Sequence, residues 1–204
     1  MGYVYVDSGS LYRGVTWKTI REGVPASDPL AVAELLGRIG VEACVLEGAV
    51  RFSIDGEDPG EALRSEAVVE RVSDVAAIPA VRQFVVDRLR ETTRYGNLVM
   101  EGRDIGSVVF PDSRWKFYLD ADPEERARRR HREQAGEVAN EDEANDELAG
   151  VRDSLQRRDR KDATRTANPL QVASGAHVIN TTTMSIEEVS QSIVDQMLGI
   201  CTTH

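Results

Sequence analysis

The stretch from Glu101 to Asp120, EGRDIGSVVFPDSRWKFYLD, constrains the fold more than any other part of the chain. It reads as a polar turn at the end of a buried strand, 97–100, followed by a short loop and a second apolar strand. Glu101, Arg103 and Asp104 come just past the carboxyl end of the first strand, which is where open α/β sheets bind ligands. A guanidinium between two carboxylates indicates an anionic, hydrogen-bonding small molecule. A surface loop with an incidental ion pair is the alternative interpretation.

A second polar turn lies near the start of the chain, in the segment 7–13, DSGSLYR. A short strand-like run, 3–6, leads into Asp7, and an apolar helical pattern follows the turn. We predict that Ser8 or Ser10 caps the first amides of that helix. Arg13 then lies about one turn into the helix, close enough to reach a phosphate held at the helix entry. An ordinary capped helix start explains the same residues without a ligand.

Strand-like and helical segments alternate along the chain, which predicts an α/β fold. Strands are expected at 3–6, 97–100, before Asp120, at 176–180, and in a hairpin over 41–54 that turns at Glu47-Gly48. Helices are expected at 11–22, 28–40, 65–76, 79–95, 126–133, 145–164 and 186–197. The segments Asp122–Glu125 and Ser185–Glu188 have the spacing of capping boxes, so they mark two of the helix starts.

Composition excludes several classes of protein. The net charge of −10 at pH 7 argues against a nucleic-acid binder, because affinity for phosphate backbones needs clustered Lys and Arg. The sequence has no apolar run of about 18 residues and no signal peptide, so a soluble, cytoplasmic protein with no membrane partner is expected. Cys44 and Cys201 lie far apart and outside any CxxC, which favours unpaired thiols. The acidic segment 133–147 lacks apolar periodicity and is expected to be exposed and mobile.

A third charged group lies near the end of the predicted helix 145–164. Arg158, Asp162 and Arg165 are spaced at i, i+4 and i+7, which places all three on one helical face. Taken alone, this spacing is typical of an ion pair on a solvated helix, worth a few tenths of a kcal/mol.

Together these segments resemble a known family. DSGSLYR is followed by SDVAAIPAVR at Ser73–Arg82, by EGRDIGSVVFPD and by RDRKDATR at Arg158–Arg165. The residue types in these segments, and the order of the segments along the chain, are similar to those of bacterial cytidylate kinases. The resemblance is collinear over residues 3–198. The resemblance implies a P-loop nucleoside monophosphate kinase-like parallel sheet flanked by helices. It also implies a core of 1–40, 77–121 and 165–204, a CMP-binding α+β insertion at 41–76, and helical lid segments at 122–164.

The resemblance also implies roles for individual side chains. Those expected to contact the base are Ser73, Arg82, Asp104 and Arg165, because cytosine offers an amino donor beside two acceptors. Asp162 is expected to bind the sugar, and Ser8 to belong to the CMP site. The expected clamp for the α-phosphate is formed by Arg13, Arg103 and Arg158. The residues expected to act in transfer are Asp7, Arg103 and Arg158, with Arg126, Arg129 and Arg157 as lid arginines facing ATP. The cofactor implied is Mg²⁺ bound with ATP, with no dedicated protein metal site.

One motif of that family does not occur in this sequence. No GxxxxGK[ST] is present, and six residues precede Asp7. Such a loop cradles the phosphates of ATP and supplies a lysine and a metal-binding hydroxyl. We therefore expect the chain as written to encode the acceptor half of the site without the first strand and P-loop, and to have lost most activity. A start codon assigned too far downstream and a true truncation would both give this sequence.

The function expected is phosphorylation of CMP and dCMP by ATP, in pyrimidine nucleotide metabolism, by a monomer. The alternative from another class is a non-catalytic homologue that binds CMP, and a third hypothesis is a non-functional truncated relative. Ligand-induced thermal stabilisation separates the last two, because only a protein that binds CMP is stabilised by it.

Overall fold

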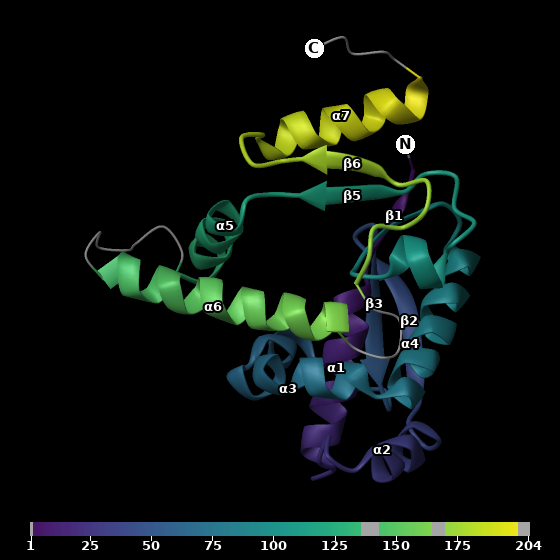
Figure 1. Ribbon diagram of the computed structural model, residues 1–204. Helices are drawn as coiled ribbons and strands as arrows, with labels where there is room; N and C mark the ends of the chain where they lie inside the picture. The colour runs from purple at the N-terminus through teal and green to yellow at the C-terminus, as the bar shows by residue number, and fades with distance from the viewer. Residues whose placement is uncertain (1, 136–142, 165–169, 200–204) are drawn as a thin grey trace.

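The computed structural model describes residues 2–135, 143–164 and 170–199 (Figure 1). The strands are β1 Val4–Asp7, β2 Val41–Leu46, β3 Ala49–Ile54, β4 Leu98–Glu101, β5 Phe117–Asp120 and β6 His177–Asn180. The α-helices are α1 Ser8–Arg21, α2 Pro29–Leu36, α3 Glu66–Ala77, α4 Pro79–Glu91, α5 Pro123–Ala135, α6 Glu143–Thr164 and α7 Ile186–Leu198. The predicted alternation of strands and helices is confirmed.

The larger sheet contains four strands in the order β2-β3-β1-β4. Strand β1 runs parallel to both β3 and β4, and β2 and β3 form the predicted antiparallel hairpin. The hairpin turns at Glu47 and Gly48, whose φ angles of 51° and 77° lie in the left-handed region that tight hairpin turns require. Asp7 and Glu101 are register partners, so β1 and β4 end side by side.

A second, two-stranded sheet pairs β5 with β6 in parallel, and α7 lies beside it (Figure 1). The strands described therefore form two sheets, while the family resemblance implies one. Three of the four strand pairings are parallel, and helices flank both sheets. The fold class is thus the predicted α/β class, with the described strands divided between two sheets.

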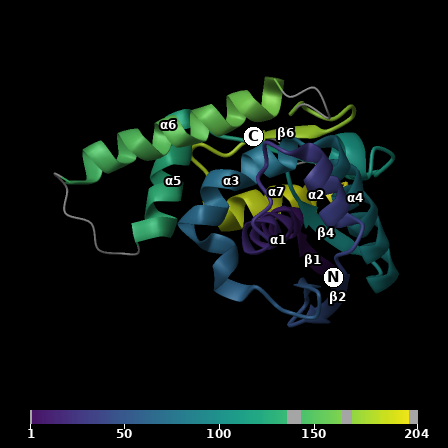
Figure 2. The ribbon, with the colours of Figure 1, turned by 90° about the horizontal axis from the view of Figure 1, so that it is seen from below.

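The core lies between the larger sheet and the helices α1 to α4. Val81, Val85 and Leu89 recur every four residues on α4 and are fully buried, as are Leu11 and Val15 on α1. The opposite face of the sheet is open in the described structure: Tyr5 and Val99, which are register partners, are 43% and 55% exposed. Seen from below, α6 runs alongside α5 and α3, close to this core (Figure 2).

Several boundaries differ from the predictions for local reasons. Helix α1 begins at Ser8, three residues earlier than expected, because Asp7 caps it. Helix α2 stops at Leu36, before the capping position taken by Gly37. The expected helix 79–95 ends at Glu91 and continues as a 3₁₀ turn, and the expected loop after β4 contains a π-helical turn over Ile105–Val109. Within the described residues, none of the helices is both long and apolar enough to cross a membrane.

Candidate functional site

The candidate site begins where β1 passes into α1. The Asp7 carboxylate accepts a hydrogen bond from the Ser10 backbone N–H at 3.1 Å, and its other oxygen accepts from Arg13 at 2.5 Å. The prediction that Ser8 or Ser10 caps the helix is therefore wrong, because the helix starts early enough to make Asp7 the capping residue. The Ser10 hydroxyl instead donates to the Asp7 carbonyl. Asp7 thereby fixes the position of the Arg13 guanidinium at the helix entry.

The turn after β4 packs directly against this helix start. A Cβ added to Gly102 would lie 2.2 Å from the Ser8 hydroxyl oxygen and 2.9 Å from the Ile105 side chain. Ser8 itself is buried. Glycine is therefore required at position 102, and the two polar turns recognised in the sequence form one continuous surface at the carboxyl ends of β1 and β4.

The three charged residues of the second turn have separate partners. Glu101 is the last residue of β4 and accepts a hydrogen bond from the Tyr5 hydroxyl at 2.6 Å. Burial of that hydroxyl and its bond to the carboxylate both raise the pKa of Tyr5 above its usual value. Arg103 and Asp104 bind residues of other helices. The strand therefore continues one residue beyond the predicted 97–100, and it directs Glu101 to the open face of the sheet.

Asp104 forms an ion pair with Arg82 from the first turn of α4. The side chains are 4% and 3% exposed, so this pair is among the most buried charges described. Arg82 also donates to the Ala76 carbonyl at 3.2 Å, and its guanidinium carbon lies 5.5 Å from the Tyr12 ring centroid. Its Nε–H is buried without a hydrogen-bond partner. Ser73 lies one turn before the end of α3, half-buried.

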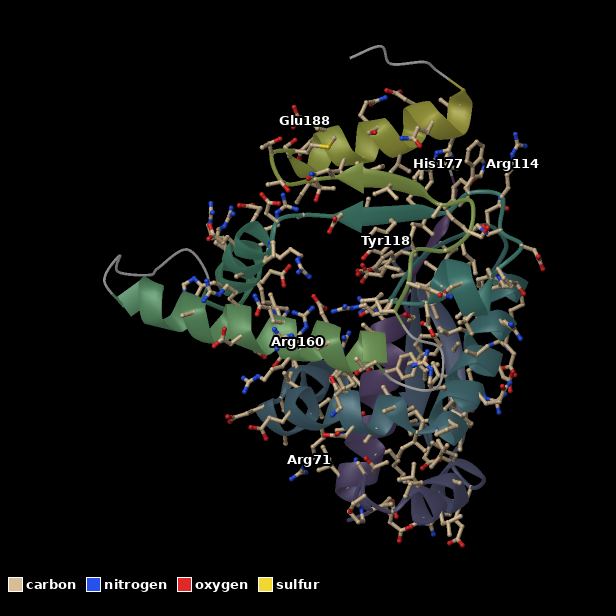
Figure 3. All side chains as sticks on the ribbon, viewed as in Figure 1. Arg71, Arg114, Tyr118, Arg160, His177 and Glu188 are labelled. Carbon is tan, nitrogen blue, oxygen red and sulfur yellow. The ribbon has the colours of Figure 1, made fainter. Side chains whose placement is uncertain are left out.

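A carboxylate that the sequence interpretation missed links this turn to helices α5 and α6. Asp159 on α6 accepts from Arg103 at 2.6 Å and from Arg126 on α5 at 2.5 Å. Burial raises the pKa of the Asp159 carboxyl, but the hydrogen bonds from the two guanidiniums outweigh burial and hold that pKa below its usual value. Arg160, labelled in Figure 3, marks the part of α6 on which Asp159 lies.

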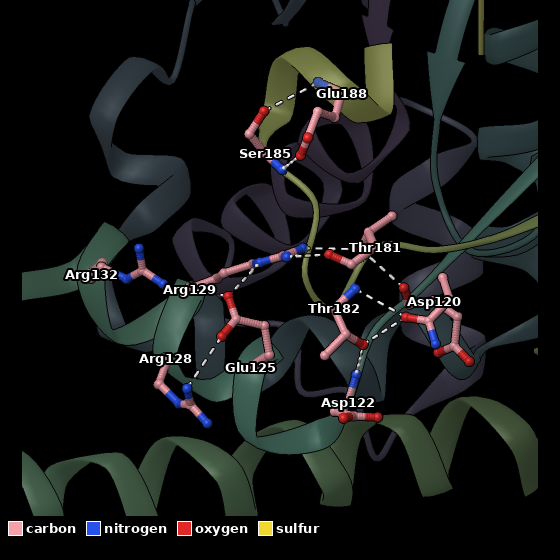
Figure 4. Close-up of polar contacts among 11 residues, drawn as sticks. Asp120, Asp122, Glu125, Arg128, Arg129, Arg132, Thr181, Thr182, Ser185 and Glu188 are labelled. Atoms are coloured by element: carbon pink, nitrogen blue, oxygen red, sulfur yellow. Dashed lines mark hydrogen bonds and ion pairs between the residues drawn. The ribbon is translucent and has the colours of Figure 1, made fainter. Parts of the chain in front are cut away.

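All three nitrogens of the Arg129 guanidinium donate hydrogen bonds, two of them to Thr181 just past β6 and one to Glu125 (Figure 4). It donates to the Thr181 hydroxyl at 3.0 Å, to the Thr181 carbonyl at 2.6 Å and to Glu125 at 3.0 Å. Glu125 therefore serves Arg129 and does not close the capping box predicted with Asp122, whose backbone N–H donates to Thr182 at 3.0 Å. The second predicted box is confirmed: Ser185 and Glu188 exchange both hydrogen bonds.

The remaining predicted residues are placed only in part. Arg157 is exposed on α6. Arg158 and Asp162 belong to the same helix, and their side chains lie outside the described part of the structure. Arg165 and Cys201 also lie outside it, as do residues 136–142 of the acidic segment. Cys44 is an exposed free thiol.

The residues described do not build a magnesium site by themselves. No group of three or more His, Cys, Asp or Glu side chains converges among them. Asp7, the acidic residue expected near the transferred phosphoryl group, already accepts hydrogen bonds at both carboxylate oxygens.

Comparison with known proteins gives the same family that the sequence resembles. The family model for cytidylate kinase matches residues 1–198. A cytidylate kinase of Pelotomaculum thermopropionicum is 42% identical over 95% of this chain and 84% of its own length. One from Geobacillus thermodenitrificans is 37% identical over 96% of this chain and 85% of its own length. A bifunctional pantoate ligase/cytidylate kinase of Trichodesmium erythraeum is 39% identical over 98% of this chain and 37% of its own length.

Proposed function

The chain belongs to the cytidylate kinase family, and on that premise we propose that it carries the acceptor site of a kinase that phosphorylates CMP and dCMP with ATP. The observation that carries the proposal is the buried pair of Arg82 and Asp104 at the carboxyl end of β4. A carboxylate complements the N4 amino group of cytosine, and a guanidinium complements its N3 and O2 acceptors. Uracil would present an acceptor oxygen to the same carboxylate, so the pair favours cytosine.

The other groups of the proposed site surround this pair. The proposed phosphate clamp consists of Arg13, Arg103 and Arg158, with Asp162 for the sugar and Ser73, Ser8 and Arg165 completing the CMP site. Asp7 supports the clamp because it fixes the Arg13 guanidinium at 2.5 Å. Arginine forks suit phosphate because they donate two parallel hydrogen bonds to its oxygens.

The chemistry proposed is direct transfer of the terminal phosphoryl group of ATP to the phosphate of CMP. Positioning and charge neutralisation supply nearly all the catalysis of such a reaction, and no covalent intermediate is needed. When bound with ATP, Mg²⁺ supplies part of that neutralisation. The lid arginines proposed to face the donor are Arg126, Arg129 and Arg157.

A second candidate, a CMP-binding protein without transferase activity, is favoured by one observation. The 204 residues contain no GxxxxGK[ST] motif, so they contain no such loop to hold the phosphates of ATP. The two candidates share the CMP site and differ in turnover.

A coupled assay of ADP release with ATP, Mg²⁺ and CMP tests the proposal, with UMP as the control for the base. The chain as written is compared with a form extended upstream to the next in-frame start. Turnover selective for CMP in either form supports the kinase. CMP binding by calorimetry without turnover in both forms supports the second candidate, and absence of CMP binding in both refutes the two together.

The base-reading pair is tested separately with Asp104→Asn, which replaces the carboxylate with an amide of the same shape. We expect the preference for CMP over UMP to fall by at least about tenfold, because a buried amide accepts less well from the cytosine amino group. Asp112→Asn is the matched control, since Asp112 is exposed eight residues further along the same loop. An unchanged preference in Asp104→Asn would contradict the assignment.

A further inference from the structure

Asp159 lies between two guanidiniums that come from different parts of the fold. Its Oδ1 lies 2.6 Å from Nη1 of Arg103, which follows β4, and its Oδ2 lies 2.5 Å from Nη1 of Arg126 on α5. The carboxylate is 21% exposed, and the guanidinium side chains are 33% and 38% exposed. The three groups thus form a partly buried charge cluster where α5, α6 and the turn after β4 meet.

The carboxylate explains how two like charges stay close together. Arg103 and Arg126 would repel one another if no anion lay between them, and their long side chains would separate. Because the hydrogen bonds from both guanidiniums lower the pKa of Asp159, the group is ionised near neutral pH. It uses one terminal nitrogen of each guanidinium, and each guanidinium carries five N–H donors. Because a guanidinium fork suits phosphate oxygens as well as a carboxylate, the two arginines ordered by Asp159 are of the type that binds a phosphate.

We propose that Asp159 is a positioning residue that orients Arg103 for binding the phosphate of the acceptor and ties it to Arg126, an arginine proposed to face the donor. The identity of that phosphate as part of CMP rests on the proposed function. Asp159 acts through the two arginines and does not itself touch the nucleotide. Helix α6 packs against α5 and contacts α3, and an exposed ion pair between Lys161 and Asp74 lies at the same end of α6.

Competition with phosphate and positioning of the arginines predict opposite changes in phosphate affinity for Asp159→Asn. The sign of the change in affinity therefore decides between them. If the carboxylate merely competes with phosphate for the arginines, its neutralisation should strengthen binding of any phosphate. If it positions the arginines, its neutralisation should weaken binding, because the guanidiniums lose their shared anchor and must be ordered by the ligand.

Calorimetric titration with CMP and with cytidine separates these cases, because cytidine lacks the phosphate. In Asp159→Asn we expect CMP affinity to fall about tenfold with cytidine affinity unchanged, a loss typical of one charge-assisted hydrogen bond. Asp159→Glu keeps the carboxylate and should recover part of the affinity. Asp153→Asn, an exposed change on the same helix, is the control and should bind like the wild type. Stronger or unchanged CMP binding in Asp159→Asn overturns the proposal, as does an equal loss for CMP and cytidine.

Inorganic phosphate is a second probe that depends on the arginines and not on the base. Phosphate should raise the melting temperature of the wild type more than that of Asp159→Asn, with sodium chloride at equal ionic strength as the control. If phosphate distinguishes the two proteins but CMP binds neither, the proposed function fails and the positioning role stands. If phosphate stabilises both equally or neither, the positioning role is overturned.

Discussion

Replacing Arg82 with methionine should destabilise the protein strongly, because it leaves the Asp104 carboxylate buried without its guanidinium. Both side chains are at most 4% exposed, so solvent does not screen their interaction appreciably. Breaking a buried ion pair by removing one partner costs about 3–5 kcal/mol. For a protein of this size, 1 kcal/mol corresponds to roughly 2–4 °C, so the melting temperature should fall by about 6–20 °C.

Replacing both partners should restore most of this loss. In Arg82→Met/Asp104→Leu no charge is left buried, and apolar replacement of such a pair is often neutral or stabilising. The recovery should be incomplete by about 1–2 kcal/mol, because the Ala76 carbonyl also loses the donor that lies 3.2 Å away. The double variant lacks the carboxylate and should not discriminate cytosine from uracil, so stability and base recognition should separate in it.

Urea unfolding followed by circular dichroism measures these differences, with Arg71→Met, an exposed change on α3, as the control. A single variant that loses less than about 1 kcal/mol would show that the pair is not buried as described. A double variant as unstable as the single one would refute the argument that the stranded charge causes the loss.

Three further predictions concern other parts of the fold. Gly102→Ala should lower the free energy of unfolding by about 1–3 kcal/mol in urea, because its Cβ would overlap Ser8. Gly150→Ala, at an exposed position of α6, should raise it by about 0.5–1 kcal/mol, because alanine favours a helix more than glycine does. Equal effects at the two glycines would contradict the close approach at Gly102. Ser185→Ala should cost about 0.5–2 kcal/mol in the same measurement through loss of the capping box, while no loss would argue against that box. The pKa of Asp159 is lower in the folded protein than its ordinary value near 4, so the ionised carboxylate stabilises the fold at pH values above 4. This stabilisation is lost as the pH falls through the lowered pKa. The difference in melting temperature between wild type and Asp159→Asn should therefore shrink below pH 4, and a constant difference down to pH 2 would contradict this.

Local patterns in the sequence were sufficient to predict most of the helices and strands. The spacing of Val81, Val85 and Leu89 predicts a helix because one face of it is buried. Glu47-Gly48 predicts the hairpin turn because glycine adopts positive φ without steric cost, and φ is positive at both residues in the structure. These features depend on neighbours within a few residues, and the structure confirms them.

The partners of the site's charged residues could not be predicted in this way. Asp159 lies in a run of charges, RRDRKD, in which nothing local distinguishes it from its neighbours, and its partners are 56 and 33 residues away. Asp104 and Arg82 are likewise 22 residues apart. The orientation of Glu101 was accessible in principle: once the strand extends through Glu101, alternation places it on the same face as the exposed Val99.

The division of the strands between two sheets also orders events during synthesis. All strands of the larger sheet lie between Val4 and Glu101, and both strands of the smaller one lie between Phe117 and Asn180. At about 5–20 residues per second, the ribosome adds Asp159 roughly 3–11 s after Arg103, since 56 residues separate them. Arg82 and Asp104, the pair proposed to read the base, are therefore both present in a nascent chain that still lacks the carboxylate proposed to orient the phosphate clamp.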